Sequence, residues 1–458
     1  MRILHYALGF VPYRSGGLTR YVSDVTDAQH AAGHDVAMLW PGRMGSSKVP
    51  YIKRHRSVHG IGSFELCNPL PVVLDQRVGD PEVFHYPVDG SCYRRFFESY
   101  HPDIIHIHTL QGLHREFVDA AHEASIPTVF TTHDFFGLYP MNAIYPMDHN
   151  LSDWECTVIN ASAPSLTQLR ILQSPIMRWV KSSVILRRIL KTASGIRKAR
   201  GKEPSKATPD RPIQTCSNMM KPYSDFRSYV IAMLNSIDCI LYNSEVSKHA
   251  YERYCTPRAS VVLPITHADM PKRMHDSQVG KHDRIHIAFL GGDRPYKGLS
   301  LIQKVASMLQ SEKIDEYHFD VYGAEGTSDN WVTYHQSFDD FEEEMTEWDI
   351  VAVPSLTYES FGFVVPEALS CGIPAIVSDC VGAKELIRNG FGWIFRAGDI
   401  QQMAYLIQQI NHNILSGASK ELMNSYEPEE FSLHCLNLYG RYQFNINKRD
   451  CKCNYRER

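Results

Sequence analysis

The stretch YESFGFVVPEAL, residues 358–369, contains two glutamates eight positions apart, Glu359 and Glu367. Pro366 is tolerated only in the first turn of a helix, so we predict that a helix begins near residues 362–364. The free backbone N–H groups at such a helix start bind anions. Carboxylates on both sides of these amides suit a ligand with hydroxyl groups on both sides of a phosphate, as in a nucleotide sugar.

A structural explanation fits the same spacing. In that interpretation, Glu367 is an acidic residue that favours the N-terminal end of the helix dipole. Glu359 is then a solvated loop residue. Both interpretations stay open on this stretch alone.

Further candidate residues follow other apolar runs. Lys297 lies in GGDRPYKGLSL after the run RIHIAFLGG, where it would meet phosphate charge unless it is an ordinary exposed lysine. That segment lacks the G-x-G-x-x-G fingerprint of dinucleotide-binding folds. Gly16 and Gly17 precede a helical pattern and would let the backbone approach a phosphate or sugar, unless they form a simple turn. His133 follows the run TVFTT, where a lone histidine is more often structural.

Two series of short apolar strands, which alternate with helical patterns, must position these residues. The first series is RILHYAL, DVAMLW, IIHIH, TVFTTH and CILYNS, and the second is RIHIAFLGG, HFDVYG, IVAVPS and PAIVSD. Helical patterns cover residues 19–32 and 116–124. We predict an α/β protein with two Rossmann-like, doubly wound parallel-sheet domains that face a cleft. Ligands of open α/β sheets bind at the carboxyl ends of the strands, so the cleft is the expected site, although receptors that close on a ligand share this architecture.

The same patterns predict the domain organisation. We expect an N-terminal domain at residues 1–265 with a basic insertion at about 165–212, a linker at 266–283, a second domain at 284–425, a helix at 426–445, and a tail at 446–458.

Composition narrows the class of protein. The 458 residues carry a net charge of −4, which gives no general signature of nucleic-acid binding. The eleven cysteines lack zinc-site spacing apart from the pair Cys451 and Cys453, and their odd number favours reduced thiols in a cytosol. No apolar run approaches the roughly 20 residues of a membrane span, and the apolar opening is too short for a secretory signal. We therefore expect a cytoplasmic protein.

The motifs occur in an order that resembles retaining glycosyltransferases of family four, of the bacterial surface-polysaccharide type. The order is the glycine pair, PDIIHIH, TTHDF, YNSE, YKG, YESFGFVVPEALSCGIPAIVSD and GAKELIRNGFGWIF. The resemblance covers residues 1 to about 396, and the double-glutamate segment is its most specific part. It implies the two-domain GT-B fold and a nucleotide-diphosphate sugar, UDP- or GDP-linked, as the donor. It further implies that the domain at 1–265 binds the acceptor, that the domain at 284–425 binds the nucleotide sugar, and that the helix at 426–445 crosses back to the N-terminal domain.

The resemblance also implies roles for individual residues. Glu359 would contact the donor hexose, Glu367 the ribose hydroxyls, and Lys297 the diphosphate. Gly17 and His133 would lie on the acceptor side, near the reacting sugar. The candidate catalytic residues are Lys297, Glu359 and His133; the candidate donor-binding residues are Arg294, Glu359, Phe361, Gly362, Phe363, Val364 and Glu367; and Gly16 and Gly17 form the acceptor or phosphate side.

One position departs from the family pattern. The family usually has an arginine five residues before the lysine, and this chain has Gly292 there, with Arg294 as the nearest arginine. Arg294 either reaches the phosphates from the altered loop, or the donor is held with one cation fewer.

The expected mechanism depends on charge. Breaking the nucleotide–sugar bond leaves a diphosphate, and each good donor stabilises such charge by about 3 kcal/mol. Because no Asp-x-Asp motif occurs, we predict a metal-independent reaction without a cofactor. The resemblance implies retention of configuration by same-face attack, with the departing phosphate accepting the acceptor's proton.

A basic segment bears on the acceptor. Residues 170–206 contain eleven Arg and Lys against one acid, Glu203, and SPIMRWVKSSVILRRILK has the pattern of a basic amphipathic helix. Such a helix lies on an anionic membrane surface, which would suit a lipid-linked saccharide acceptor and a peripheral location on the inner face of the membrane. The alternative is an ordinary helix that packs its apolar face on the first domain.

Other function classes stay open. A nucleotide-sugar epimerase or a phosphorylase shares the fold, although no lysine that would bind a phosphorylase cofactor is identifiable. A catalytically silent sugar-nucleotide-binding partner subunit is the third class; the departure at Gly292 favours it, and the presence of Lys297, Glu359 and Glu367 argues against it.

Overall fold

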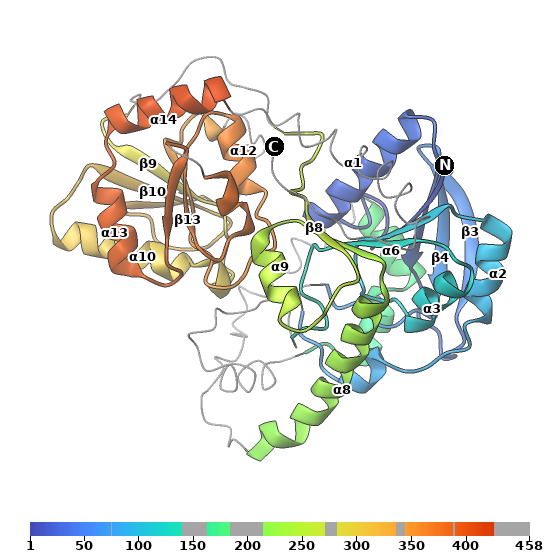
Figure 1. The fold of residues 1–458 in the computed structure, drawn as a ribbon. Helices are drawn as coiled ribbons and strands as arrows, with labels where there is room; N and C mark the ends of the chain where they lie inside the picture. Colours follow the sequence, from blue (N-terminus) through green and yellow to red (C-terminus); the bar gives the residue numbers. More distant parts are fainter. Residues whose placement is uncertain are drawn as a thin grey trace.

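The structure is a computed structural model that describes residues 1–74, 76–139, 163–183, 214–270, 282–335, 344–387 and 390–425. The chain forms two lobes, each built on one sheet with helices around it (Figure 1). The first lobe is coloured blue to green, and the second is coloured yellow to red.

The first lobe contains an eight-stranded sheet. Its strands are β1 (Arg2–Tyr6), β2 (Asp35–Pro41), β3 (Tyr51–Val58), β4 (Ile61–Cys67), β5 (Ile104–Ile107), β6 (Thr128–Thr131), β7 (Cys239–Tyr242) and β8 (Ser260–Val262). The spatial order is β3-β4-β2-β1-β5-β6-β7-β8, and every pair is parallel except the hairpin β3–β4. The helices are α1 (Gly17–Ala31), η1 (Pro81–Phe84), α2 (Ser91–Tyr100), α3 (Arg115–Glu123), α5 (Leu166–Leu172), α6 (Pro175–Ser182), α8 (Gln214–Ser236) and α9 (Glu245–Glu252).

The second lobe contains a six-stranded parallel sheet. Its strands are β9 (Ile285–Phe289), β10 (Tyr317–Tyr322), β11 (Val332–His335), β12 (Ile350–Val353), β13 (Ala375–Ser378) and β14 (Gly392–Phe395), in the order β11-β10-β9-β12-β13-β14. The helices are η2 (Pro295–Lys297), α10 (Leu299–Ser311), α12 (Val364–Ser370), η3 (Gly382–Leu386), α13 (Ile400–Gln408) and α14 (His412–Ser425). In each lobe the first strand lies inside the sheet, so both sheets are doubly wound.

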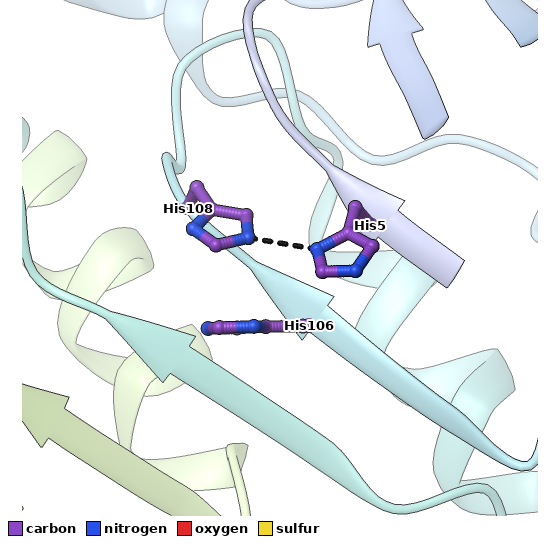
Figure 2. Close-up of side chains that lie close together, drawn as sticks. All are labelled: His5, His106 and His108. Carbon is purple, nitrogen blue, oxygen red and sulfur yellow. Dashed lines mark hydrogen bonds between the residues drawn. The ribbon is translucent and has the colours of Figure 1, made fainter. Parts of the chain in front are cut away.

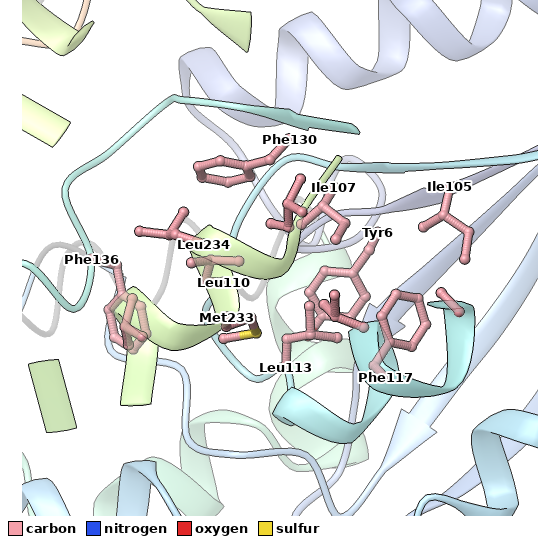
Figure 3. Close-up of a cluster of buried hydrophobic side chains, with 14 of the residues drawn as sticks. Tyr6, Ile105, Ile107, Leu110, Leu113, Phe117, Phe130, Phe136, Met233 and Leu234 are labelled. Atoms are coloured by element: carbon pink, nitrogen blue, oxygen red, sulfur yellow. The ribbon is translucent and has the colours of Figure 1, made fainter. Parts of the chain in front are cut away.

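Each lobe has its own apolar core. In the first lobe, Tyr6, Ile105 and Ile107 of the sheet meet Phe117 of α3 and Leu234 of α8, all fully buried (Figure 3). Because the parallel strands are covered on both faces, they appear in the sequence as nearly continuous apolar runs.

The prediction of an α/β protein with two parallel sheets is confirmed, and each of the nine predicted runs contains a strand, with β2 and β10 each extending one residue beyond its run. The sequence did not predict β3, β4, β8, β11 and β14. The reason is clearest at β3, whose sequence YIKRHRSV is exposed or half-buried and lacks an apolar run. An edge strand of this kind buries too little apolar surface to leave a clear pattern.

The predicted basic helix differs in the structure. The described residues form two short helices, α5 and α6, and α6 starts where Ser174 caps it and ends at Ser182. Ser183 is extended, with φ −86° and ψ 123°, so a single continuous helix from residue 174 to residue 191 is wrong. The remainder of the basic segment, at 184–206, lies outside the described residues, as do the predicted helix at 426–445, the tail at 446–458 and linker residues 271–281. The domain boundaries stay predictions.

Within the described ranges, no helix is both long and apolar enough to cross a bilayer. The six cysteines with described side chains are free thiols, and all are buried.

Candidate active site between the two lobes

Glu359 lies in the loop between β12 and α12. The predicted helix start is confirmed, because α12 begins at Val364 and Phe363 is its N-cap. The Glu359 N–H donates to the Cys380 carbonyl at 3.0 Å, and the Glu359 carbonyl accepts from the Gly382 N–H at 2.9 Å. Two backbone hydrogen bonds therefore fix the loop to the segment that follows β13.

Lys297 and Glu359 form an ion pair. Lys297 Nζ lies 2.6 Å from Glu359 Oε1, and the Ser355 hydroxyl donates to Glu359 Oε2 at 2.7 Å. Both charged side chains are mostly buried, with 24% and 20% of their surface exposed. Burial raises the pKa of Glu359, but the neighbouring Lys297 and Ser355 lower it, and the net pKa lies below its usual value. The carboxylate is therefore ionised at neutral pH and acts as an acceptor of hydrogen bonds.

A glycine makes this pairing possible. Gly298 follows Lys297 with φ 90°, and a Cβ there would clash with the carbonyl oxygen of Pro354 at the end of β12. The close approach of the two loops holds Lys297 beside Ser355 and Glu359.

Arg294 also acts on this site. Its positive charge lowers the pKa of Glu359, so the guanidinium lies within electrostatic range of the carboxylate. Gly292 occupies the position where the resemblance implies an arginine, and its φ is 64°. A Cβ atom added at Gly292 would lie 3.3 Å from the Gly323 carbonyl oxygen. Whether Arg294 takes the place of that arginine on the donor phosphates stays a prediction.

Glu367 in α12 contacts the first lobe. Its Oε1 atom accepts a hydrogen bond from His267 Nε2 at 2.8 Å and lies 3.3 Å from Arg20 Nη1 of α1. Arg20 also pairs with Asp269 at 3.2 Å. The Glu367 side chain is 12% exposed. Neither Arg20 nor His267 is predicted from the sequence as a site residue, although Arg20 lies only one helical turn beyond the glycine pair.

The segment between the two glutamates packs against the first lobe. The Ser360 hydroxyl donates to the His133 carbonyl at 2.8 Å, and the Ser244 hydroxyl donates to the Ser360 carbonyl at 2.6 Å. A Cβ added at Gly17 would lie 2.8 Å from the Phe363 ring, closer than real Cβ contacts occur. The structure therefore brings Gly17, His133 and the glutamate segment together. Gly16 is the N-cap of α1, with φ 107°.

A chain of hydrogen-bonded histidines leads from His133 into the sheet. Figure 2 shows its inner part, the His5–His108 hydrogen bond, with His106 beside it. His133 Nε2 lies 3.4 Å from His108 Nδ1, His108 Nε2 lies 2.9 Å from His5 Nδ1, and His5 Nε2 lies 2.8 Å from the Gln29 side-chain oxygen. His5 belongs to β1, and His108 follows β5, so two neighbouring strands bring them together.

These histidines are neutral. Burial lowers the pKa of His5 to about 4 and that of His133 to about 3. Because the Gln29 oxygen accepts a hydrogen bond from His5 Nε2–H, His5 Nδ1 must accept from His108 Nε2–H, and His108 Nδ1 must accept from His133 Nε2–H. The hydrogen-bond direction therefore leaves His133 Nδ1 as an acceptor.

The same cluster has the spacing of metal ligands. His5, His106 and His108 each offer one nitrogen, and these nitrogens lie within 4.8 Å of one another. His106 Nε2 bonds to the Thr131 hydroxyl at 2.7 Å. An ion would have to replace the His5–His108 hydrogen bond and would enter a fully buried cluster that offers only neutral ligands. The prediction of a metal-independent protein stays a prediction.

Two glycosyltransferase families match the chain. Glycosyl transferases group 1 matches residues 272–421, which contain the second sheet. Glycosyltransferase Family 4 matches residues 15–179, which contain much of the first sheet. A search of curated protein sequences finds no match.

Solved structures share the whole architecture. Sucrose-phosphate synthase from Thermosynechococcus elongatus is 15% identical, with a TM-score of 0.54 over 96% of this chain and 98% of its own. HepE from Anabaena in complex with UDP is 14% identical, with a TM-score of 0.56 over 96% of this chain and 100% of its own. The catalytic domain of starch synthase IV from Arabidopsis thaliana, bound to ADP and acarbose, is 13% identical, with a TM-score of 0.52 over 97% and 99%.

At sequence identities of 13–15%, the similarity to these solved structures establishes the fold alone. The chain has the two-domain GT-B architecture. Together with the two family matches, this supports a GT-B glycosyltransferase of the family 4 and group 1 type.

Proposed function

We propose that the chain is a retaining, metal-independent hexosyltransferase that uses a UDP- or GDP-sugar as donor and a saccharide, lipid-linked in a surface-polysaccharide or glycolipid pathway, as acceptor. The observation that carries this proposal is the Lys297–Glu359 ion pair at the carboxyl ends of β9 and β12, with Glu367 one turn into the helix that follows. Open α/β sheets bind nucleotides at this edge.

Lys297 stabilises the leaving diphosphate. An ammonium group has three donors, so Lys297 can hold Glu359 and phosphate oxygens at the same time. The backbone amides of residues 361–364 and the guanidinium of Arg294 supply further positive charge. Glu359, kept ionised by Lys297, accepts hydrogen bonds from hydroxyls of the donor hexose.

Glu367 binds the ribose. Both of its contacts with the first lobe, from His267 and Arg20, use Oε1. We assign Oε2 to the ribose hydroxyls, because a carboxylate accepts about four hydrogen bonds. The first lobe would thereby orient the carboxylate toward the nucleotide.

The acceptor lies on the side of the first lobe. His133 presents an acceptor nitrogen toward the reacting sugar, and Gly16 and Gly17 let the acceptor approach closely. The acceptor hydroxyl attacks from the face that the diphosphate leaves, and its proton goes to the departing phosphate oxygen. This route retains the anomeric configuration and uses no metal ion.

A membrane-bound acceptor is supported by α5 and α6. Ile171, Ile176 and Trp179 are exposed by 55%, 75% and 68%. Arg170, which is also exposed, lies on α5. Exposed apolar and basic side chains on short surface helices suit an anionic membrane surface. We therefore propose a cytoplasmic protein that binds the inner face of the membrane peripherally.

The test is a ¹H NMR assay with UDP- and GDP-hexoses. We expect slow release of free hexose without acceptor, and the first-formed product to have the anomeric configuration of the donor. Release of an epimerised nucleotide sugar would identify an epimerase. Binding of the nucleotide sugar, measured by calorimetry, without any turnover would identify a catalytically silent sugar-nucleotide-binding subunit.

A further inference from the structure

A second group of cations lies in the first lobe, away from Lys297. Tyr13 and Arg14 belong to the loop between β1 and α1, and Arg178 and Lys181 belong to α6. We call these four residues the Arg14 cluster. The Arg14 guanidinium lies 4.4 Å from the Tyr13 ring centre, and Lys181 Nζ lies 6.0 Å from the same ring. Two segments more than 160 residues apart in the sequence thus meet at one aromatic ring.

Arg14 is buried without a compensating charge. It is 5% exposed, and its Nε donates to the Leu8 carbonyl at 3.3 Å. Its Nη2 atom is buried and has no hydrogen-bond partner among the described residues, and the Tyr13 hydroxyl is in the same situation. A buried donor without an acceptor destabilises a protein, and a buried charge without a counter-charge does so more strongly.

The acid nearest to the cluster is already engaged. Glu65 pairs with Arg178 at 2.7 Å, and it also accepts hydrogen bonds from His55 Nε2 at 2.8 Å and from the Arg43 N–H at 2.9 Å. In the part of the chain that the structure describes, neither Arg14 nor Lys181 has an ion-pair partner.

The positive charges act on one another. Burial lowers the pKa of Arg14, and the charge of Arg178 lowers it further. Burial likewise lowers the pKa of Lys181, and the charge of Arg14 adds to this effect. Burial raises the pKa of Tyr13, so its hydroxyl keeps its proton and can donate. An anion at this position would relieve the repulsion and accept from both unpaired donors.

We infer that the Arg14 cluster binds a phosphate group carried by the acceptor. Arg14 Nη2 and the Tyr13 hydroxyl would donate to phosphate oxygens, and Lys181 would add a point charge. The loop runs directly into Gly16 and Gly17, so a phosphate held here lies on the acceptor side. That the ligand is the acceptor rests on the proposed function, whereas the anion site itself does not.

Two sources share this chemistry, a soluble sugar phosphate and the phosphate headgroup of a lipid-linked acceptor. The experiment measures binding by calorimetry in saturating UDP, so that the donor site is filled. The probes are glucose 6-phosphate, vesicles of phosphatidylcholine with a polyprenyl phosphate, and, as blanks, glucose and plain phosphatidylcholine vesicles. The variants are Arg14→Gln and Lys181→Gln, with Arg56→Gln at an exposed strand position as the matched control.

We expect one phosphate-bearing probe to bind, and both cluster variants to weaken it roughly tenfold or more, since a hydrogen bond to a charged group contributes that much. Arg56→Gln should bind as the wild type does. If binding of glucose 6-phosphate depends on Arg14 and Lys181, the ligand is a soluble sugar phosphate. If only binding to the polyprenyl phosphate vesicles depends on them, the ligand is the headgroup of a lipid-linked acceptor. If neither probe binds, or the variants bind as tightly as Arg56→Gln, the inference is wrong.

The two proposals fail separately. If the chain binds UDP but neither phosphate-bearing probe, only the inference about the Arg14 cluster is refuted. If the chain binds a phosphate-bearing probe through Arg14 but binds no nucleotide, only the proposed function is refuted. Lys181 is only half-buried on a surface helix, so we expect Lys181→Gln to fold even if Arg14→Gln does not. The test can then be carried out with Lys181→Gln alone.

Discussion

Replacing Lys297 with methionine should destabilise the second lobe and reverse its response to pH. The substitution keeps most of the side-chain volume but leaves the Glu359 carboxylate, 20% exposed, without its cation. Removing one partner of a fully buried pair destabilises by about 3–5 kcal/mol, and an exposed pair contributes about 0–1 kcal/mol. Partial exposure places this pair between the two, at about 2 kcal/mol.

The pH dependence has a defined sign. In the wild type, the pKa of Glu359 is below its usual value, so its stabilising contribution is present above the unfolded-state pKa and is lost as the pH falls through the folded-state pKa. Without Lys297, the effect of burial dominates and the pKa rises. The variant should then lose stability as the pH increases through that raised pKa.

Differential scanning calorimetry at pH 7 and pH 4 measures both effects. About 2 kcal/mol corresponds to a decrease of roughly 4–8 °C in the Tm of a lobe of this size. The deficit should be smaller at pH 4. Lys304→Met, at an exposed position of α10, is the control and should keep the wild-type Tm. Adding Glu359→Gln to Lys297→Met should recover stability; a double variant no more stable than Lys297→Met would refute the coupling of the two residues.

Other predictions concern the contacts between the lobes and the buried histidines. Glu367→Ala should raise the Kd for UDP or GDP roughly tenfold, measured by calorimetry, and an unchanged Kd would remove its assignment to the ribose. Gly17→Ala should reduce turnover roughly tenfold or more, because the added Cβ would lie 2.8 Å from the Phe363 ring, whereas Gly417→Ala, with open space around it, should keep the wild-type rate. Because burial lowers the pKa of His5 to about 4, the wild-type Tm should decrease as the pH falls from 6.5 toward 4, and His5→Gln should show a shallower decrease; parallel curves would contradict the neutral histidine chain.

The sequence predicts local features of the site well. Pro366 and the apolar residues around it fix the start of α12, and the apolar runs fix nine strands, because buried parallel strands and helix starts depend on nearby residues. The edge strand β3 escapes prediction because its sequence YIKRHRSV has four consecutive basic residues in the middle, is exposed or half-buried throughout, and contains neither a buried apolar run nor an alternating pattern.

Contacts between distant segments escape prediction for a different reason. Lys297 and Glu359 meet because β9 and β12 are neighbours in the sheet, and the sequence does not state that order. The Arg20–Glu367 contact joins residues 347 positions apart. Arg14 belongs to no motif, and it is marked only by its burial with an unpaired Nη2 atom and no ion-pair partner among the described residues. Charge pairing across a fold depends on topology, which local patterns specify weakly.

The most direct test of the account compares donor hydrolysis by Lys297→Met and Lys304→Met, two lysine variants of the same lobe. Single-turnover hydrolysis of the nucleotide sugar that the wild type accepts should be slowed roughly 100-fold or more by Lys297→Met, the usual effect of removing one donor that stabilises transition-state charge. Lys304→Met should hydrolyse the donor at the wild-type rate. Equal rates in the two variants would contradict the assignment of the diphosphate to Lys297 and, with it, the proposed active site.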